Sequence, residues 1–213
     1  MKMKNDLICQ SSEYDCDPTC LTNALRYLYE RKEILPGLLK QIWLVGNDTY
    51  CEKGCVGCRG TSKAAMRYMA DWFNCYAKGW RFPIGAEFLE NEQAEITPDG
   101  RVWQCLQKGG CAVMRCTSGG IPHYVLLTAL LPEGEIGLFD PYAEEPDFKE
   151  PGRRVVYGKP KEYNRAVRYD LLNLQDKADY AMGELKDRDL LLDRKSTRLN
   201  SSHPTTSRMP SSA

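Results

Sequence analysis

The chain has 213 residues, with 29 basic and 29 acidic side chains, ten cysteines and two histidines. This length fits one domain and suffices for a hydrophobic core without disulfide bonds. The net charge of zero argues against a general nucleic-acid binder, which carries a basic excess, and the apolar runs are too short for a membrane span. Because the N-terminus lacks the pattern of a signal peptide, we expect a cytoplasmic protein whose cysteines are largely free thiols.

The first half of the chain is predicted to be mainly helical. Apolar residues at helical spacing predict a helix over 18–31, with Asp17 as its N-cap and Pro18 at its first position. Further helices are expected over about 36–45, from Thr61-Ser62 onwards and over 99–108. The glycine- and cysteine-rich residues 46–60 are predicted to form a loop.

From residue 111 onwards the pattern becomes strand-like. Strands are predicted over 111–116, 123–131, 136–140 and about 163–170, with turns at 118–120 and 132–134. Helices followed by neighbouring strands predict an α+β fold, with N-terminal helices packed on a C-terminal antiparallel sheet.

The last segment, residues 193–213, differs from the rest in composition. It is rich in Ser, Thr, Arg and Pro and has no hydrophobic periodicity. Residues 193–203 and 207–213 resemble the translation of a common sequencing adapter on both sides of a short index. We therefore expect an artefactual, disordered tail after a single folded domain over 1–192. The segment holds four basic residues, one acidic residue and His203, so the remainder has a net charge of −3 and His123 as its single histidine.

Four residues at the ends of predicted elements could together perform covalent catalysis. Cys16 lies just ahead of the first predicted helix, where the helix dipole favours a thiolate. His123 begins one strand and Asp140 ends the next, so a hairpin would bring them together as base and orienting carboxylate. Gln10 could donate an amide N–H to an oxyanion, beside the Cys16 backbone N–H. Each residue alone has an ordinary structural explanation, but the combination indicates a nucleophile with its base.

The motifs around these residues resemble the bacteriocin-processing cysteine peptidases, cysteine-peptidase family 39, which are papain-like domains. The similar segments are Gln10-Ser-Ser-Glu-Tyr-Asp-Cys-Asp-Pro-Thr-Cys-Leu21, Pro122-His-Tyr-Val-Leu-Leu127 and Leu138-Phe-Asp-Pro141. Motifs of the family thus span about residues 7–142. Residues 143–192 resemble the C-terminal extension of free-standing bacterial members, and neither transporter spans nor a phosphate-binding loop is found in the sequence.

The resemblance implies a papain-like fold and a specific set of roles. Cys16 would be the nucleophile, His123 the base, Asp140 the orienting residue and Gln10 the oxyanion-hole donor. The substrate would be a peptide or protein, such as a leader peptide cut after a double glycine, and a peptide exporter is a candidate partner. No cofactor and no metal are implied.

One residue departs from the family pattern. Asp17 stands where the family usually has glycine directly after the nucleophile. A carboxylate there would raise the pKa of the Cys16 thiol by like-charge repulsion and would add a side chain where the substrate passes. The alternative function is therefore a catalytically impaired homologue that binds peptides.

A second cysteine cluster, Cys51, Cys55 and Cys58, permits a different interpretation. Three thiols within eight residues could bind zinc with a fourth ligand such as Cys75. Zinc motifs usually contain two close pairs, and no second close pair is evident. The sequence therefore favours a loop with reduced thiols, with a zinc-stabilised interaction module as the less favoured alternative.

Overall fold

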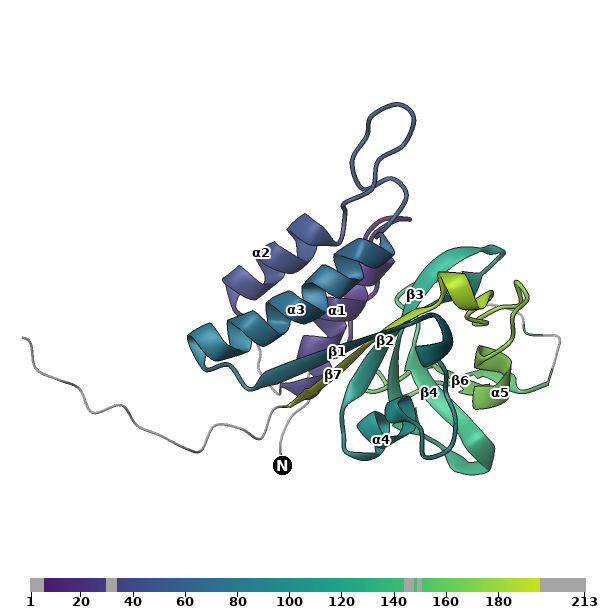
Figure 1. Cartoon of the computed structure of the whole chain (residues 1–213). Coiled ribbons are helices and arrows are strands. Elements are labelled where there is room, and N and C mark those ends of the chain that lie inside the picture. The colour runs from purple at the N-terminus through teal and green to yellow at the C-terminus, as the bar shows by residue number, and fades with distance from the viewer. Residues whose placement is uncertain (1–5, 30–33, 144–147, 149–150, 196–213) are drawn as a thin grey trace, which may run out of the picture.

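The chain folds into helices packed on an antiparallel sheet, as the order of the predicted elements indicates (Figure 1). The computed structural model describes residues 6–29, 34–143, 148 and 151–195. The helices in this part are α1 (Cys16–Leu28), α2 (Pro36–Val45), α3 (Lys63–Trp80), α4 (Arg101–Gln107) and α5 (Tyr169–Leu172). The strands are β1 (Ile84–Glu90), β2 (Cys111–Ser118), β3 (Ile121–Leu130), β4 (Glu135–Phe139), β5 (Arg153–Val155), β6 (Arg165–Arg168) and β7 (Asp189–Lys195). Short 3₁₀ turns cover Asn91–Gln93, Pro132–Gly134 and Leu185–Asp187.

The strands form one sheet in the order β1-β7-β2-β3-β4-β6-β5, and all neighbouring pairs are antiparallel. The mixed α+β class predicted from the sequence is confirmed. Strands β2, β3, β4 and β6 match the predicted strands, whereas β1, β5 and β7 were not predicted. Strand β7, the last strand of the described residues, lies between β1 and β2 and so joins these two strands from the middle of the sequence into one sheet (Figure 1).

The sheet has a hydrophobic core on each face. Alternate residues of β2 point in opposite directions, so Cys111 and Val113 pack with α1, α2 and α3, whereas Met114 and Cys116 pack with α4 and α5. Helix α3 begins where the sequence predicts, because the Ser62 hydroxyl accepts a hydrogen bond from the Ala65 N–H at 3.1 Å. The buried side chains of α3 recur at helical spacing and form the stripe that faces the sheet.

Helix α1 begins earlier than the sequence analysis predicts. Its first helical residue is Cys16, and Asp15 occupies the N-cap position. The Asp15 carboxylate does not cap the helix but accepts hydrogen bonds from the backbone N–H groups of Ser11 and Ser12, at 3.1 and 2.9 Å. Asp17 therefore lies in the first turn, and its predicted role as the N-cap is wrong.

The folded part extends beyond the boundary predicted at residue 192. Strand β7 continues to Lys195, and Asp193 and Arg194 pair with Ala86 and Gly85 of β1. Asp193 is fully buried, and neither of its carboxyl oxygens has a partner with good hydrogen-bond geometry among the described residues. Burial raises its pKa to about 8, against a smaller opposing influence of the Arg194 backbone. The boundary therefore moves by three residues, and the remainder of the predicted tail, 196–213, lies outside the described residues.

Candidate active site

His123 and Asp140 form a buried pair at the end of the β3–β4 hairpin. Leu126 of β3 pairs with Phe139 of β4, so Asp140 leaves the sheet beside the beginning of β3. Its Oδ1 atom lies 2.8 Å from Nε2 of His123. The two residues are only 7% and 3% exposed, so water competes little with this hydrogen bond. The hairpin predicted from the sequence thus brings these residues into contact.

Asp140 is fixed from several directions. Its Oδ2 accepts a hydrogen bond from the Tyr180 hydroxyl at 2.8 Å, and its Oδ1 accepts one from the Tyr142 backbone N–H at 2.9 Å. The Asn164 amide bonds both the N–H and the C=O of Asp140, each at 2.8 Å. Burial raises the pKa of Asp140, but the hydrogen bond and charge of His123, with the Tyr142 and Tyr180 donors, bring it below its ordinary value. The group is therefore held as a carboxylate.

Tyr180 and Asn164 were not found by sequence reasoning. Tyr180 lies 40 residues after Asp140 in a segment between α5 and β7, and no motif links the two positions. Asn164 immediately precedes β6 and acts on Asp140 only because β6 pairs with β4. Neither contact has a signal in residue spacing, since both depend on how distant segments pack.

Cys16 completes the group from the other side of the His123 ring. It is the first residue of α1 and is 6% exposed. Burial lowers the pKa of His123, but hydrogen bonds donated by its ring to Asp140 and Cys16, together with electrostatic attraction to both groups, raise it to about 10. Because Asp140 occupies Nε2, Nδ1 is the ring nitrogen available to Cys16. The structure thus brings together the three side chains predicted as nucleophile, base and orienting carboxylate.

Gln10 lies next to the segment that carries Asp140, but its side chain is engaged locally. Its backbone N–H donates to the Pro141 carbonyl at 2.9 Å, and Asn23 of α1 binds both backbone groups of neighbouring Ile8. The Gln10 amide nitrogen donates to the Ser12 carbonyl at 2.8 Å. An amide NH₂ group has two hydrogens, so this hydrogen bond uses one of the two Gln10 donors.

Asp17 is directed into the interior. It is fully buried, and neither carboxyl oxygen has a partner with hydrogen-bond geometry among the described residues. A Cβ added to Gly46, at the end of α2, would lie 3.2 Å from its Oδ2. The Thr61 hydroxyl is nearby but donates to the Gly46 carbonyl. The Asp17 side chain therefore packs in the interior beside the end of α2 and does not extend over an open surface.

The buried position of Asp17 also changes its expected electrostatic effect on Cys16. Burial raises the pKa of Asp17 well above its ordinary value, and the influence of Thr61 lowers it only in part. A raised pKa favours the neutral carboxyl group, which exerts no like-charge repulsion on a thiolate. Both objections to activity raised by the sequence, repulsion and obstruction, are therefore weakened by this geometry.

We expect Asp17→Asn to stabilise the fold at neutral pH by about 1–3 kcal/mol, because it removes the cost of a buried ionisable group. The raised pKa means that the native state retains a proton that the unfolded chain releases above about pH 3.9, so stability falls as pH rises. Denaturant unfolding at pH 4 and pH 8 measures this, with the exposed Asp71→Asn as the control. The prediction would be contradicted if the gain in unfolding free energy of Asp17→Asn over the unsubstituted protein does not grow from pH 4 to pH 8.

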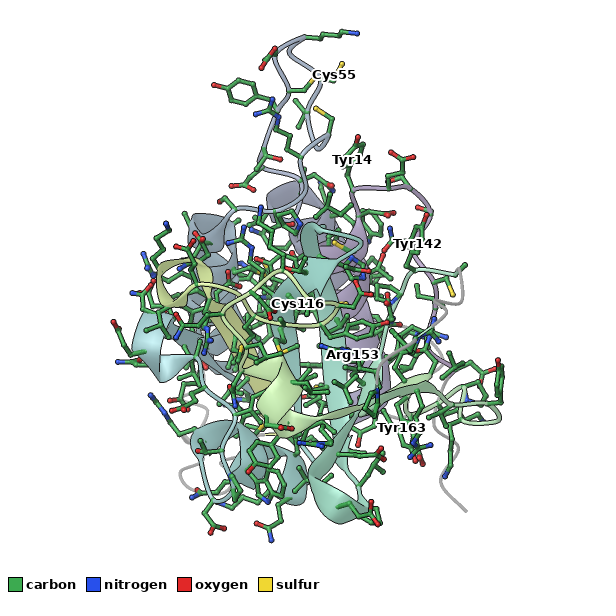
Figure 2. All side chains as sticks on the ribbon, turned by 90° about the vertical axis from the view of Figure 1, so that its right-hand side faces the viewer. Tyr14, Cys55, Cys116, Tyr142, Arg153 and Tyr163 are labelled. Carbon is green, nitrogen blue, oxygen red and sulfur yellow. The ribbon has the colours of Figure 1, made fainter. Side chains whose placement is uncertain are left out.

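Two depressions flank the His123–Asp140 pair. One, of about 340 Å³, lies beside Asp140 and is lined by aromatic and aliphatic side chains that include Tyr142, Val155, Tyr157 and Tyr163. The other, of about 230 Å³, lies beside Pro122 and Cys116, and its lining includes charged side chains of both signs, namely Arg115, Asp176, Lys177, Glu184 and Asp187. In Figure 2, Tyr142 and Tyr163 mark the apolar depression and Cys116 marks the charged one.

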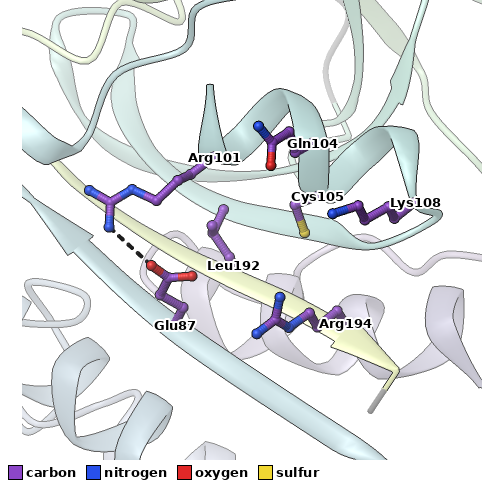
Figure 3. Close-up of a pocket in the computed structure, with 7 residues that line it drawn as sticks. All are labelled: Glu87, Arg101, Gln104, Cys105, Lys108, Leu192 and Arg194. Atoms are coloured by element: carbon purple, nitrogen blue, oxygen red, sulfur yellow. Dashed lines mark hydrogen bonds and ion pairs between the residues drawn. The ribbon is translucent and has the colours of Figure 1, made fainter. Parts of the chain in front are cut away.

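A third pocket, of about 130 Å³, lies between α4, β1 and β7 at the opposite end of β2 from His123 (Figure 3). Arg101 and Glu87 form an ion pair of 3.0 Å at its rim. Its one cysteine, Cys105, is a poor nucleophile because burial raises its pKa to about 11. This pocket is therefore a weaker candidate for covalent catalysis than the site predicted at Cys16.

Comparison with known protein families and with curated protein sequences finds no match to this chain. Among the described residues, no group of three or more His, Cys, Asp or Glu side chains is arranged to hold a metal ion. The described helices also include none with the length and apolar character needed to cross a membrane.

Proposed function

We propose that this chain is a cysteine peptidase with a papain-like fold. The observation that carries the proposal is the buried 2.8 Å contact between His123 and Asp140, with Cys16 at the start of α1 on the other side of the ring. The resemblance of the surrounding motifs to the bacteriocin-processing peptidases supports the same reaction and favours a leader peptide as substrate. Cys16, His123 and Asp140 have the chemistry of a nucleophile, a proton carrier and an orienting group.

Each part of this arrangement has a step in peptide hydrolysis. The Cys16 thiolate attacks the scissile carbonyl carbon, an S–C bond forms, and the carbonyl oxygen becomes an oxyanion. The backbone N–H of Cys16 and the free amide hydrogen of Gln10 would stabilise this oxyanion. Protonated His123 then gives its Nδ1 proton to the departing amine as the C–N bond breaks. Water, deprotonated by His123, attacks the thioester and regenerates Cys16.

The two depressions that flank the pair support an extended peptide as the substrate. A peptide that crosses the site could place an aliphatic or aromatic side chain in the depression beside Tyr142 and Tyr163. On the other side, the mixed charges of Arg115, Lys177 and Asp187 suit polar residues. Peptides with a double-glycine site and an apolar residue nearby are therefore the first substrates to test.

The test combines peptide hydrolysis with mapping of iodoacetamide labelling on the same protein. We expect hydrolysis of such peptides and rapid labelling of Cys16, both lost in His123→Ala because the imidazolium no longer stabilises the thiolate. The buried thiols Cys20, Cys111 and Cys116, whose pKa values are raised by burial, are internal controls that should label slowly. Rapid labelling without hydrolysis would favour the impaired, peptide-binding alternative. Labelling of Cys16 no faster than of Cys20 would overturn the proposed Cys–His pair.

A further inference from the structure

The loop between α2 and α3 projects from the body of the protein (Figure 1) and has a well-defined internal structure. Its base is closed by a hydrogen bond from the Thr49 hydroxyl to the Gly60 carbonyl at 2.6 Å, and by one from the Ser62 N–H to Asp48 at 2.9 Å. Nearer the tip, an antiparallel bridge joins Tyr50 and Val56. The loop therefore holds the side chains it carries at defined positions.

Three thiols meet inside this loop. The Cys55 carbonyl accepts hydrogen bonds from the Cys51 backbone N–H at 3.1 Å and from the Cys58 thiol at 2.9 Å, so Cys51 and Cys58 meet at one oxygen atom. The Cys51 sulfur lies close to the Cys58 and Cys55 thiols and to the backbone N–H groups of Cys55 and Lys53. Cys51 and Cys58 are half-buried, and Cys55 is exposed near the tip of the loop (Figure 2). Two thiols are thus in contact with each other and within reach of small solutes.

The surroundings of Cys51 favour its thiolate over those of its neighbours. The adjacent Cys58 side chain and the backbone N–H groups of Cys55 and Lys53 lower the pKa of Cys51 to about 7, whereas desolvation and its interaction with Cys51 raise the pKa of Cys58. A thiolate beside a protonated thiol is the arrangement found where one cysteine is oxidised and a second resolves the product. Because no set of three ligands among the described residues is arranged for a metal ion, the contact favours sulfur chemistry over metal binding.

We propose that Cys51 and Cys58 form an oxidisable dithiol that hydrogen peroxide converts into a disulfide. The Cys51 thiolate attacks one peroxide oxygen, so an S–O bond forms, the O–O bond breaks and hydroxide leaves. The Cys58 sulfur then attacks the Cys51 sulfur, an S–S bond forms, and the hydroxyl group departs as water with the Cys58 proton. One peroxide is reduced and two thiols are oxidised.

This inference is independent of the proposed peptidase activity, and its test uses the full chain in a Cys16→Ser background. The protein is exposed to hydrogen peroxide at pH 6, alkylated and mapped by mass spectrometry. We expect a peptide in which Cys51 and Cys58 are linked with the loss of two hydrogens. The greater thiolate fraction at a pKa near 7, offset by lower nucleophilicity, predicts oxidation of Cys51 about sixfold faster than that of an ordinary exposed thiol.

Three variants determine the outcome. Cys58→Ser should leave Cys51 as a sulfenic acid that dimedone traps. Cys51→Ser should abolish the linked peptide. The matched control Cys75→Ser replaces an exposed cysteine of α3 and should leave the yield of the linked peptide unchanged. Oxidation of Cys51 no faster than that of Cys75 would overturn the proposal. So would equal pairing of Cys51 with cysteines outside the loop, or thiols that react only after a chelator removes a metal.

Discussion

Cys16→Ser is expected to lower kcat/KM for peptide hydrolysis by at least about 10³-fold. The reason lies in the protonation of His123, whose pKa is raised to about 10 by Asp140 and Cys16 against the effect of burial. An imidazolium can stabilise a thiolate, but it has no free lone pair to deprotonate a serine hydroxyl at neutral pH. The substitution replaces sulfur by a smaller atom, so thermal unfolding should change little while hydrolysis is lost.

The His123→Ala variant tests whether Cys16 and His123 act as a unit. Substitutions of residues that cooperate in one step reduce activity non-additively. The double variant with Cys16→Ser and His123→Ala should therefore be about as inactive as either single variant. Cys116→Ala is the matched control, because Cys116 is a buried thiol paired with His123 across β2 and β3. The assignment of Cys16 as the nucleophile would be contradicted if the activity losses of the two single variants multiply in the double variant. An equal loss of activity in Cys116→Ala would also contradict it.

Local sequence signals were sufficient where a single element determines the structure. Pro36 and Ser62 mark the starts of α2 and α3 because a proline in the first turn and a serine N-cap act within a few residues. The β3–β4 hairpin is equally local, and it alone places His123 next to Asp140. The His123–Asp140 pair therefore follows from residue order, whereas the position of Cys16 beside it depends on the packing of α1 against β3.

Long-range packing determined what the sequence did not show. Strand β7 has a short apolar run, Leu190 to Leu192, and becomes a strand because it inserts between β1 and β2, which lie about a hundred residues earlier. Such a run has no alternation and cannot be distinguished from a buried turn or helix by pattern alone. The contact of Tyr180 with Asp140 depends on the same kind of packing.

Asp17 shows how a correct local signal can be assigned to the wrong position. Aspartate before proline is a common helix start, but the Asp15 carbonyl already accepts the Thr19 N–H at 3.1 Å, so the helix begins two residues earlier. Once Asp17 lies within the first turn, its side chain points towards Gly46 and the interior. Its burial, and hence its raised pKa, follows from the packing of α2 on α1 and could not be derived from the motif.

Asp140→Asn is expected to reduce kcat by about 10²–10⁴-fold and to move the alkaline limit of activity to lower pH. The hydrogen bond to Asp140 is the largest of the effects that raise the pKa of His123, and the charge of Asp140 adds to it. With the carboxylate present, His123 remains protonated until pH approaches about 10, so the Cys16–His123 pair should be maintained up to that value. The same proton contributes stability that is complete below about pH 6.5, the ordinary His value, and is lost as pH rises through the folded pKa.

An asparagine keeps the size of the side chain but removes its charge, so the imidazolium should lose its proton at lower pH. Profiles of kcat/KM and of unfolding free energy against pH measure this shift, with Tyr180→Phe as the graded comparison. Tyr180→Phe removes one hydrogen bond to Oδ2 of Asp140 but leaves the carboxylate. We therefore expect kcat/KM to fall about tenfold and the alkaline limit of activity to shift much less than in Asp140→Asn. An Asp140→Asn variant whose alkaline limit is unchanged would show that another group sets the proton affinity of His123.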